Sequence, residues 1–188
     1  LVYRKPRIAI LSTGNELVDT SSAPTSSTWG FNVYDANRPG LHAAIAGLGF
    51  EVVDLGIVTD DVPTTLAALR RGMECADVIV TTGGTSMGES DLLKPLIERE
   101  LHGHIVFGRV AMKPGKPTTF ATLPGGKMIF ALPGNPASAL VTFYVFVLPA
   151  LRKLSGTLPT SSGANAWSVP QVDVVLGSEM RLDSRAEF

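Results

Sequence analysis

Short apolar runs alternate with stretches of helical periodicity along the first half of this chain, and this alternation restricts the possible folds more than any other feature. Uninterrupted apolar runs are typical of strands buried on both faces, as in parallel sheets. The predicted strands lie at 7–11, 50–56 and 77–84, and the predicted helices at 37–48, 60–76 and 90–100. This order predicts an α/β fold of three layers, in which helices cover both faces of a mainly parallel sheet.

The second half of the chain predicts a departure from a purely parallel sheet. Three further strand-like runs, at 104–112, 117–123 and 127–132, follow one another without a helix between them. Strands that follow so closely are joined by at least one hairpin, so we expect a mixed sheet. A long helix is predicted at 136–154, and Gly156 is expected to end it.

The chain is predicted to contain one complete domain. The α/β domain is assigned to residues 1–156, a linker to 157–170, and the truncated start of a C-terminal β domain to 171–188. The segment 19–32, which is rich in serine, threonine and proline, is interpreted as a surface loop. The N-terminal residues have no signal-peptide pattern, and we interpret the chain as a piece of a longer protein.

Composition excludes several classes of protein. Hydrophobic residues make up 45% of the 188 residues, which is enough for a sizeable core, and a formal net charge of -1 gives no electrostatic footprint for nucleic acid. The single cysteine, Cys75, excludes an internal disulfide and favours a reducing, cytoplasmic location. Residues 137–151 carry no charge, but they are fewer than the about 20 that cross a bilayer, so we expect a buried helix and no membrane span.

Four polar turns follow predicted strands, at 12–16, 81–91, 112–117 and 132–138. Ligands of open α/β sheets bind beyond the carboxyl ends of the strands, so these turns predict one shared ligand site. The turn at 81–91 contains Gly83 and Gly84 and precedes a helix, a combination that suits a phosphate group. An ordinary strand-to-helix turn would also explain these glycines, and both interpretations are open.

The other turns carry cations and helix-starting residues. Lys113 and Lys116 surround a Pro-Gly pair, which indicates either an anion site or a solvated hairpin tip. Asn135 is a favoured N-cap and Pro136 suits the first helical position, so the strand is expected to end and the long helix to begin there. The free N–H groups of that helix, together with Ser138, are expected to face the same edge as the lysines.

The acidic candidates are Glu16, Asp35 and Asp91, each in or beside a turn. Carboxylates that converge beside a phosphate typically hold Mg²⁺. Helix capping by Asp35 and Asp91 and a surface position for Glu16 are the alternatives. The histidines form no metal pattern, and they are interpreted as surface or packing residues.

Six segments in order resemble one family: "STGNEL", "YDANR", "DLGIVTDD", "DVIVTTGGTSMGESD", "FGRVAMKPGKPTTFA" and "FALPGNPASALVTF". They are similar to the central molybdopterin-binding domain of the molybdopterin molybdenumtransferases, which include the bacterial MoeA proteins, the plant molybdenum insertase and the gephyrin E domain. The resemblance covers about residues 5–156. Residues 179–188 also resemble the opening of the family's C-terminal β domain.

The resemblance implies hydrolysis of adenylylated molybdopterin in a step that depends on Mg²⁺ and molybdate, with release of AMP and insertion of molybdenum. It implies Asp35, Asp91 and Glu16 as catalytic residues, with Asp35 and Asp91 as metal ligands. The cofactor-binding residues that it implies are Gly83, Gly84, Thr85, Ser86, Lys113, Lys116, Asn135 and Ser138. The lysines and Ser138 would hold molybdate, and the glycine turn would receive the pterin phosphate.

Three other functions stay open from the sequence, and one of them is a bare binding module for molybdopterin. A molybdopterin adenylyltransferase, which is expected to act upstream of the insertase, shares the fold but is expected to have a "GGTG" turn followed by an Arg-Asp pair. A gephyrin-like receptor-clustering scaffold would need no catalysis. Family sites are completed across a homodimer by flanking domains that this chain lacks, so the fragment is expected to catalyse poorly or not at all.

Overall fold

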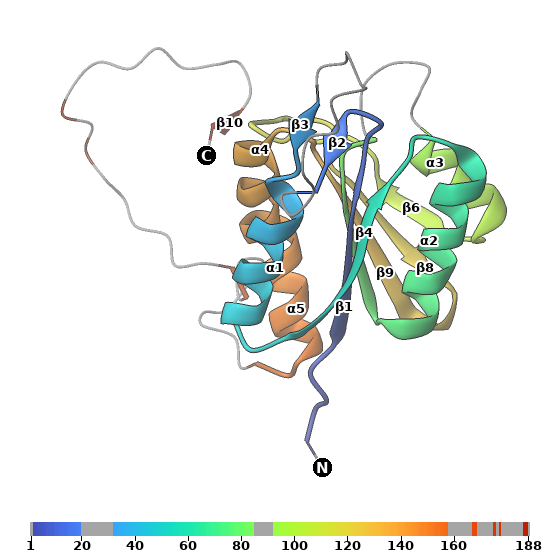
Figure 1. Ribbon diagram of the computed structural model, residues 1–188. Helices are drawn as coiled ribbons and strands as arrows, with labels where there is room; N and C mark the ends of the chain where they lie inside the picture. The colour runs from blue at the N-terminus through green and yellow to red at the C-terminus, as the bar shows by residue number, and fades with distance from the viewer. Residues whose placement is uncertain are drawn as a thin grey trace.

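A mixed sheet forms the centre of the domain in the computed structural model, which describes residues 2–19, 32–84, 92–157, 167–168, 175, 177 and 186–187. The six-stranded sheet has the order β4-β1-β5-β9-β8-β6 (Figure 1). Its strands are β4 (Glu51–Val58), β1 (Arg7–Thr13), β5 (Val78–Thr82), β9 (Lys127–Leu132), β8 (Thr119–Leu123) and β6 (His104–Phe107). The first four are parallel, and β8 runs antiparallel to both neighbours, which confirms the predicted mixed, mainly parallel sheet.

Helices cover both faces of this sheet, as the alternating pattern predicts (Figure 1). One face is covered by α1 (Asn37–Gly47) and by a helix of three parts: α4 (Pro136–Thr142), the π-helical η3 (Phe143–Val147) and α5 (Leu148–Leu154). The other face is covered by α2 (Val62–Cys75), α3 (Leu93–Pro95) and the π-helical η1 (Leu96–Glu100). Each face has its own hydrophobic core, so the domain is a three-layer α/β/α structure.

The helix at Pro136–Leu154 is the main packing element of its face. Phe143, Val147, Leu148 and Leu151 are at most 1% exposed, and full burial of such a side chain stabilises a fold by roughly 1.5–3 kcal/mol. Within the described ranges, this is the one helix that is long and apolar enough to cross a membrane by length and composition. Its packing against the sheet accounts for that composition and agrees with the predicted buried helix.

Several short elements differ from the expectations. The strand predicted at 104–112 ends at Phe107, and β7 (Met112–Lys113) instead pairs in parallel with β10 (Ala186–Glu187). Sequence reasoning missed β2 (Leu17–Val18) and β3 (Val33–Tyr34), which form a parallel ladder of two residue pairs. A 3₁₀ turn, η2 (Pro124–Gly126), joins β8 to β9.

The domain boundaries stay predictions. The last helix ends at Leu154, and Gly156 follows with a φ of 69°. Most of the segments interpreted as a surface loop, a linker and the start of a β domain lie outside the described residues.

Candidate functional site

The turn after β5 packs directly against the end of β1. Gly83 and Gly84 have φ values of 81° and 62°, in the left-handed region that favours glycine. A Cβ atom on Gly83 would lie 2.2 Å from the carbonyl oxygen of Thr13, and one on Gly84 would lie 2.6 Å from Thr13 Oγ1. Only residues without a side chain allow this approach, so the glycines here are required by packing.

The turn that begins the long helix lies beside the same glycines. A Cβ atom on Gly134 would be 3.5 Å from the Cα of Gly83. The Asn37 side chain donates a hydrogen bond of 2.7 Å to the carbonyl oxygen of Gly134. Three segments that are distant in sequence therefore meet at the carboxyl edge of the sheet: the β5 turn, the β9 turn and the start of α1.

The lysine turn packs against the first two turns of the long helix. A Cβ atom on Gly115 would lie 2.5 Å from Thr142 Cγ2, and the Thr142 hydroxyl donates to the carbonyl oxygen of Ser138 over 2.8 Å. Lys113 is exposed and Lys116 is half-buried. These contacts bring both lysines to the side of the domain where Ser138 lies.

Asn135 and Pro136 begin the helix as predicted. The Asn135 side chain accepts hydrogen bonds from the backbone N–H and the hydroxyl of Ser138, over 3.1 and 3.3 Å. Ser138 is half-buried and Asn135 is exposed. The capping interaction satisfies one free N–H of the first turn and leaves others directed at the edge, which is a favourable setting for an anion.

Glu16 lies in the turn between β1 and β2, and it is exposed. The neighbouring Asn15 joins this turn to the start of α2, because its side chain accepts from the Asp60 N–H over 3.0 Å and its own N–H donates to the Asp60 carboxylate over 3.3 Å. Asp61 caps α2 by accepting from the Thr64 N–H, as the sequence predicts. Glu16 is thus an exposed carboxylate on a turn that these hydrogen bonds hold in place.

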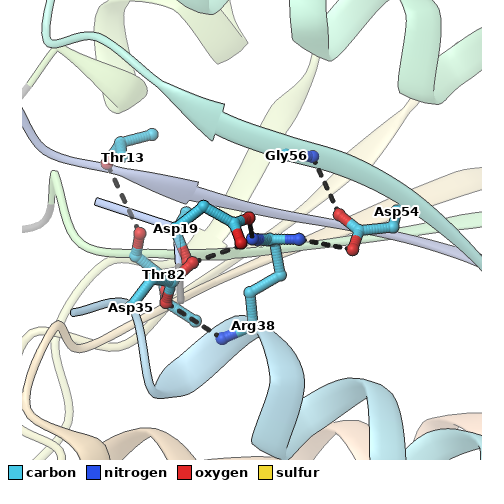
Figure 2. Close-up of polar contacts among 8 residues, drawn as sticks. Thr13, Asp19, Asp35, Arg38, Asp54, Gly56 and Thr82 are labelled. Carbon is cyan, nitrogen blue, oxygen red and sulfur yellow. Dashed lines mark hydrogen bonds and ion pairs between the residues drawn. The ribbon is translucent and has the colours of Figure 1, made fainter. Parts of the chain in front are cut away.

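Asp35 lies inside the domain, with 2% of its surface exposed. One carboxylate oxygen accepts from the Ser12 hydroxyl and the Arg38 N–H, over 3.0 and 3.2 Å, and the other accepts from Arg38 Nε over 3.1 Å. Figure 2 shows Asp35 and the Arg38 side chain in contact beneath the strand ends. Three protein donors already use this carboxylate, so its role as a metal ligand stays a prediction that the geometry does not favour.

The ionic environment of Arg38 is fixed by burial and by its partners. Burial would lower the pKa of the guanidinium, but hydrogen bonds to Asp54, Asp35 and Asp19 outweigh burial and raise the pKa above its ordinary value. Arg38 is therefore permanently charged. Over the described ranges, no three histidine, cysteine, aspartate or glutamate side chains lie close enough to hold a metal ion.

Three of the predicted site residues lie outside the described residues: Thr85, Ser86 and Asp91. Sequence reasoning singled out Asp35 but missed its partners Ser12 and Arg38, and it also missed Asn37, which donates to Gly134. Two of these missed residues, Asn37 and Arg38, stand in the same "YDANR" segment as Asp35. An arginine three residues after a buried aspartate was the available signal, because residues at i and i+3 meet at a helix start.

A second polar cluster lies at the opposite edge of the sheet. Arg4, Arg7, Asp77 and Lys127 line a hollow of about 210 Å³ with the end of α2. Arg4 donates to the Asp77 carboxylate over 2.7 Å, and the Lys127 ammonium donates to the carbonyl oxygen of Ala76 over 2.6 Å. Burial alone would raise the pKa of Asp77, but hydrogen bonds from Arg4 and the Arg7 N–H lower it below its ordinary range. These charges are engaged with one another and with the helix end.

Comparison with known proteins identifies the domain. Residues 9–153 match the family described as "Probable molybdopterin binding domain". The chain belongs to this family. This molybdopterin-binding domain is 37% identical over 97% of its length to gephyrin of Dictyostelium discoideum, and 39% identical over 82% to the molybdopterin molybdenumtransferase of Haemophilus influenzae. It covers 28% and 36% of those two proteins, so it spans about a third of their length.

A solved structure supports the same assignment. The molybdopterin biosynthesis MoeA protein of Pyrococcus horikoshii matches 82% of the molybdopterin-binding domain with a TM-score of 0.69 and 36% identity. The matched part is 36% of that chain. The α/β fold expected from the family resemblance is therefore confirmed.

Proposed function

We propose that the protein containing this domain acts in molybdenum cofactor biosynthesis as a molybdopterin molybdenumtransferase. It would take adenylylated molybdopterin, hydrolyse the phosphoanhydride with release of AMP, and insert molybdenum from molybdate. Relatives named for this activity support the reaction class. Two contacts support the proposal: Gly134, just before the long helix, lies against Gly83 of the glycine turn, and Gly115 of the lysine turn packs against Thr142 in the second turn of that helix.

The proposed division of the edge follows from charge and shape. Backbone N–H groups at Gly83 and Gly84 would receive the pterin phosphate, because side chains are absent there and a helix follows. Lys113, Lys116 and Ser138 would hold molybdate, since a tetrahedral dianion suits two ammonium groups beside a helix N-terminus. Because the pterin and the oxyanion would be bound side by side, they would lose little further translational and rotational entropy at the reaction step.

Magnesium would bind to carboxylates whose oxygens are not already used by protein donors. Glu16 fits, because it is exposed on the edge turn, whereas the oxygens of Asp35 already accept three protein hydrogen bonds. Magnesium typically binds one or two carboxylates together with phosphate oxygens and water, and Asp91 would supply the second carboxylate. A magnesium ion bound there would neutralise charge on the phosphoanhydride.

Three properties of the whole protein belong to the same proposal. It would act in the cytoplasm as a homodimer, and an upstream adenylyltransferase would supply its adenylylated pterin. The lone Cys75 is compatible with a reducing compartment.

Lys116→Ala and Ser138→Ala in the full-length protein test the proposal. We expect both variants to need at least tenfold more molybdate for half-maximal cofactor formation, with an unchanged fold. Lys5→Ala is the matched control, because Lys5 is an exposed lysine beside Gly49, away from the candidate edge. Wild-type molybdate dependence in both variants would remove the oxyanion from this turn, and consumption of ATP without AMP release would favour an adenylyltransferase.

A further inference from the structure

We propose that Arg38 is a positioning residue of this site, which sets the geometry of the glycine turn and of the Glu16 turn without touching either ligand. The inference rests on the proposed function. Arg38 has 12% of its side chain exposed and forms ion pairs with three carboxylates. Nε donates to Asp35, Nη1 to Asp54 and Nη2 to Asp19, so every nitrogen of the guanidinium has a carboxylate partner (Figure 2).

These three carboxylates belong to three separate segments. Asp19 follows β2, Asp35 stands at the entry to α1, and Asp54 lies in β4. The Asp54 carboxylate also accepts from the Gly56 N–H over 2.8 Å. A planar guanidinium with fixed donor directions can join three carboxylates in one arrangement, which a lysine ammonium cannot reproduce. Arg38 therefore fixes the relative position of the three segments.

Two of these segments form the base of the turn that carries Glu16. The β2–β3 ladder pairs Leu17 with Val33, and the Val33 N–H donates to the carbonyl oxygen of Glu16 over 2.8 Å. The Asp35 N–H donates to the carbonyl oxygen of Val18 over 3.0 Å. A ladder of two residue pairs is weak by itself, and the joint between Asp19 and Asp35 through Arg38 reinforces it.

A chain of buried hydrogen bonds leads from Arg38 to the glycine turn. The Ser12 hydroxyl donates to Asp35 and is also 3.0 Å from the Thr82 hydroxyl. A hydroxyl has a single proton, so Thr82 must donate to Ser12 in the second bond. Ser12, Thr82 and Asp35 are each at most 2% exposed. Thr82 directly precedes Gly83, and Arg38 thus orients the residue from which the glycine turn starts.

Loss of Arg38 would disturb this series of hydrogen bonds at Asp35. Asp35 would remain as a buried carboxylate without its cation, which proteins tolerate poorly, so the segment that carries it would shift or admit water. We expect the lysine turn to be unaffected, because Gly115 packs against Thr142 of the long helix and not against the segments that Arg38 joins.

The test uses Arg38→Gln and Arg38→Lys in the full-length protein. Arg70→Gln is the control, because Arg70 is 57% exposed and its ion pair with Glu100 is 3.7 Å long. We expect Arg38→Gln to raise the KM for adenylylated molybdopterin at least tenfold and to leave the KM for molybdate within twofold. Arg38→Lys should recover part of the loss, since it restores the charge but not the three directions. An unchanged pterin KM in Arg38→Gln would overturn the inference.

Amide hydrogen exchange tests the positioning role of Arg38 independently of the proposed function. Arg38→Gln should speed amide exchange at Val33 and Asp35, which are bonded to Glu16 and Val18, at least tenfold, while the Thr118 amide of the lysine turn, bonded to Gly115, exchanges as before. Wild-type protein without AMP release would count against the function alone. Uniformly faster exchange in both turns, or unchanged exchange at Val33 and Asp35 in Arg38→Gln, would overturn the positioning role.

Discussion

Replacement of Gly83 by alanine tests the close packing of strand ends that creates the candidate edge. Gly83 has a φ of 81°, and an added Cβ would lie 2.2 Å from the Thr13 carbonyl oxygen. The left-handed conformation costs alanine about 1–2 kcal/mol. Overpacking against a backbone atom adds about 1–3 kcal/mol, because the end of β1 must shift. We therefore expect Gly83→Ala to lower the free energy of unfolding by about 2–5 kcal/mol.

Gly56 provides a control that separates the two costs. Its φ is 83°, nearly that of Gly83, but a Cβ there would meet nothing within 4 Å. Gly56→Ala should therefore show only the conformational cost of about 1–2 kcal/mol. Equilibrium urea unfolding of both variants, followed by circular dichroism, measures the difference. Equal losses in the two variants would refute the close approach of the glycine turn to β1.

Three further predictions concern other parts of the domain. Asn135→Ala should lower the free energy of unfolding by about 1 kcal/mol in urea titrations, because the Ser138 N–H loses its cap; an unchanged midpoint would contradict the capping role. Leu151→Ala should cost about 2–5 kcal/mol, since Leu151 is 0% exposed, and a loss below about 1 kcal/mol would contradict the packing of α5 on the sheet. Asp77→Asn should lower the free energy of unfolding by about 1 kcal/mol near neutral pH. Most of this loss comes from the weakened bond with the Arg7 N–H, because the exposed ion pair with Arg4 contributes little. The pKa of Asp77 is lowered in the folded state, so its contribution to stability is complete above the unfolded-state pKa of about 3.9 and is lost as the pH falls through the lower folded-state value. The melting temperatures of the two proteins should therefore converge in acid. A constant difference between them at all pH values would contradict the role of the Asp77 charge.

The sequence predicted the layers of the fold because burial leaves a strong pattern. Continuous apolar runs such as "RIAIL" become strands with nearly every residue buried, and the closely spaced strands at 117–123 and 127–132 become an antiparallel pair. Local chemistry also predicted helix starts, since Asp61 and Asn135 cap the helices that follow them. These signals are local, and each can be interpreted without knowledge of the rest of the chain.

The site could be predicted only in part, because its important contacts are distant in sequence. The approach of Gly134 to Gly83 and the bond from Asn37 to Gly134 leave no trace in spacing or periodicity. The sequence marked Asp35 as a carboxylate beside a turn, but burial and three donors decide what its oxygens can bind. The two-residue ladder between β2 and β3 is too short to produce an alternating pattern.

The location of molybdenum in crystals of the full-length protein tests the central claim most directly. Anomalous diffraction after a molybdate soak should place the metal in contact with Lys113, Lys116 and Ser138, beside the start of the long helix. Lys116→Ala crystals should lose that signal. Molybdenum bound instead at the opposite edge, among Arg4, Arg7 and Lys127, would contradict the account.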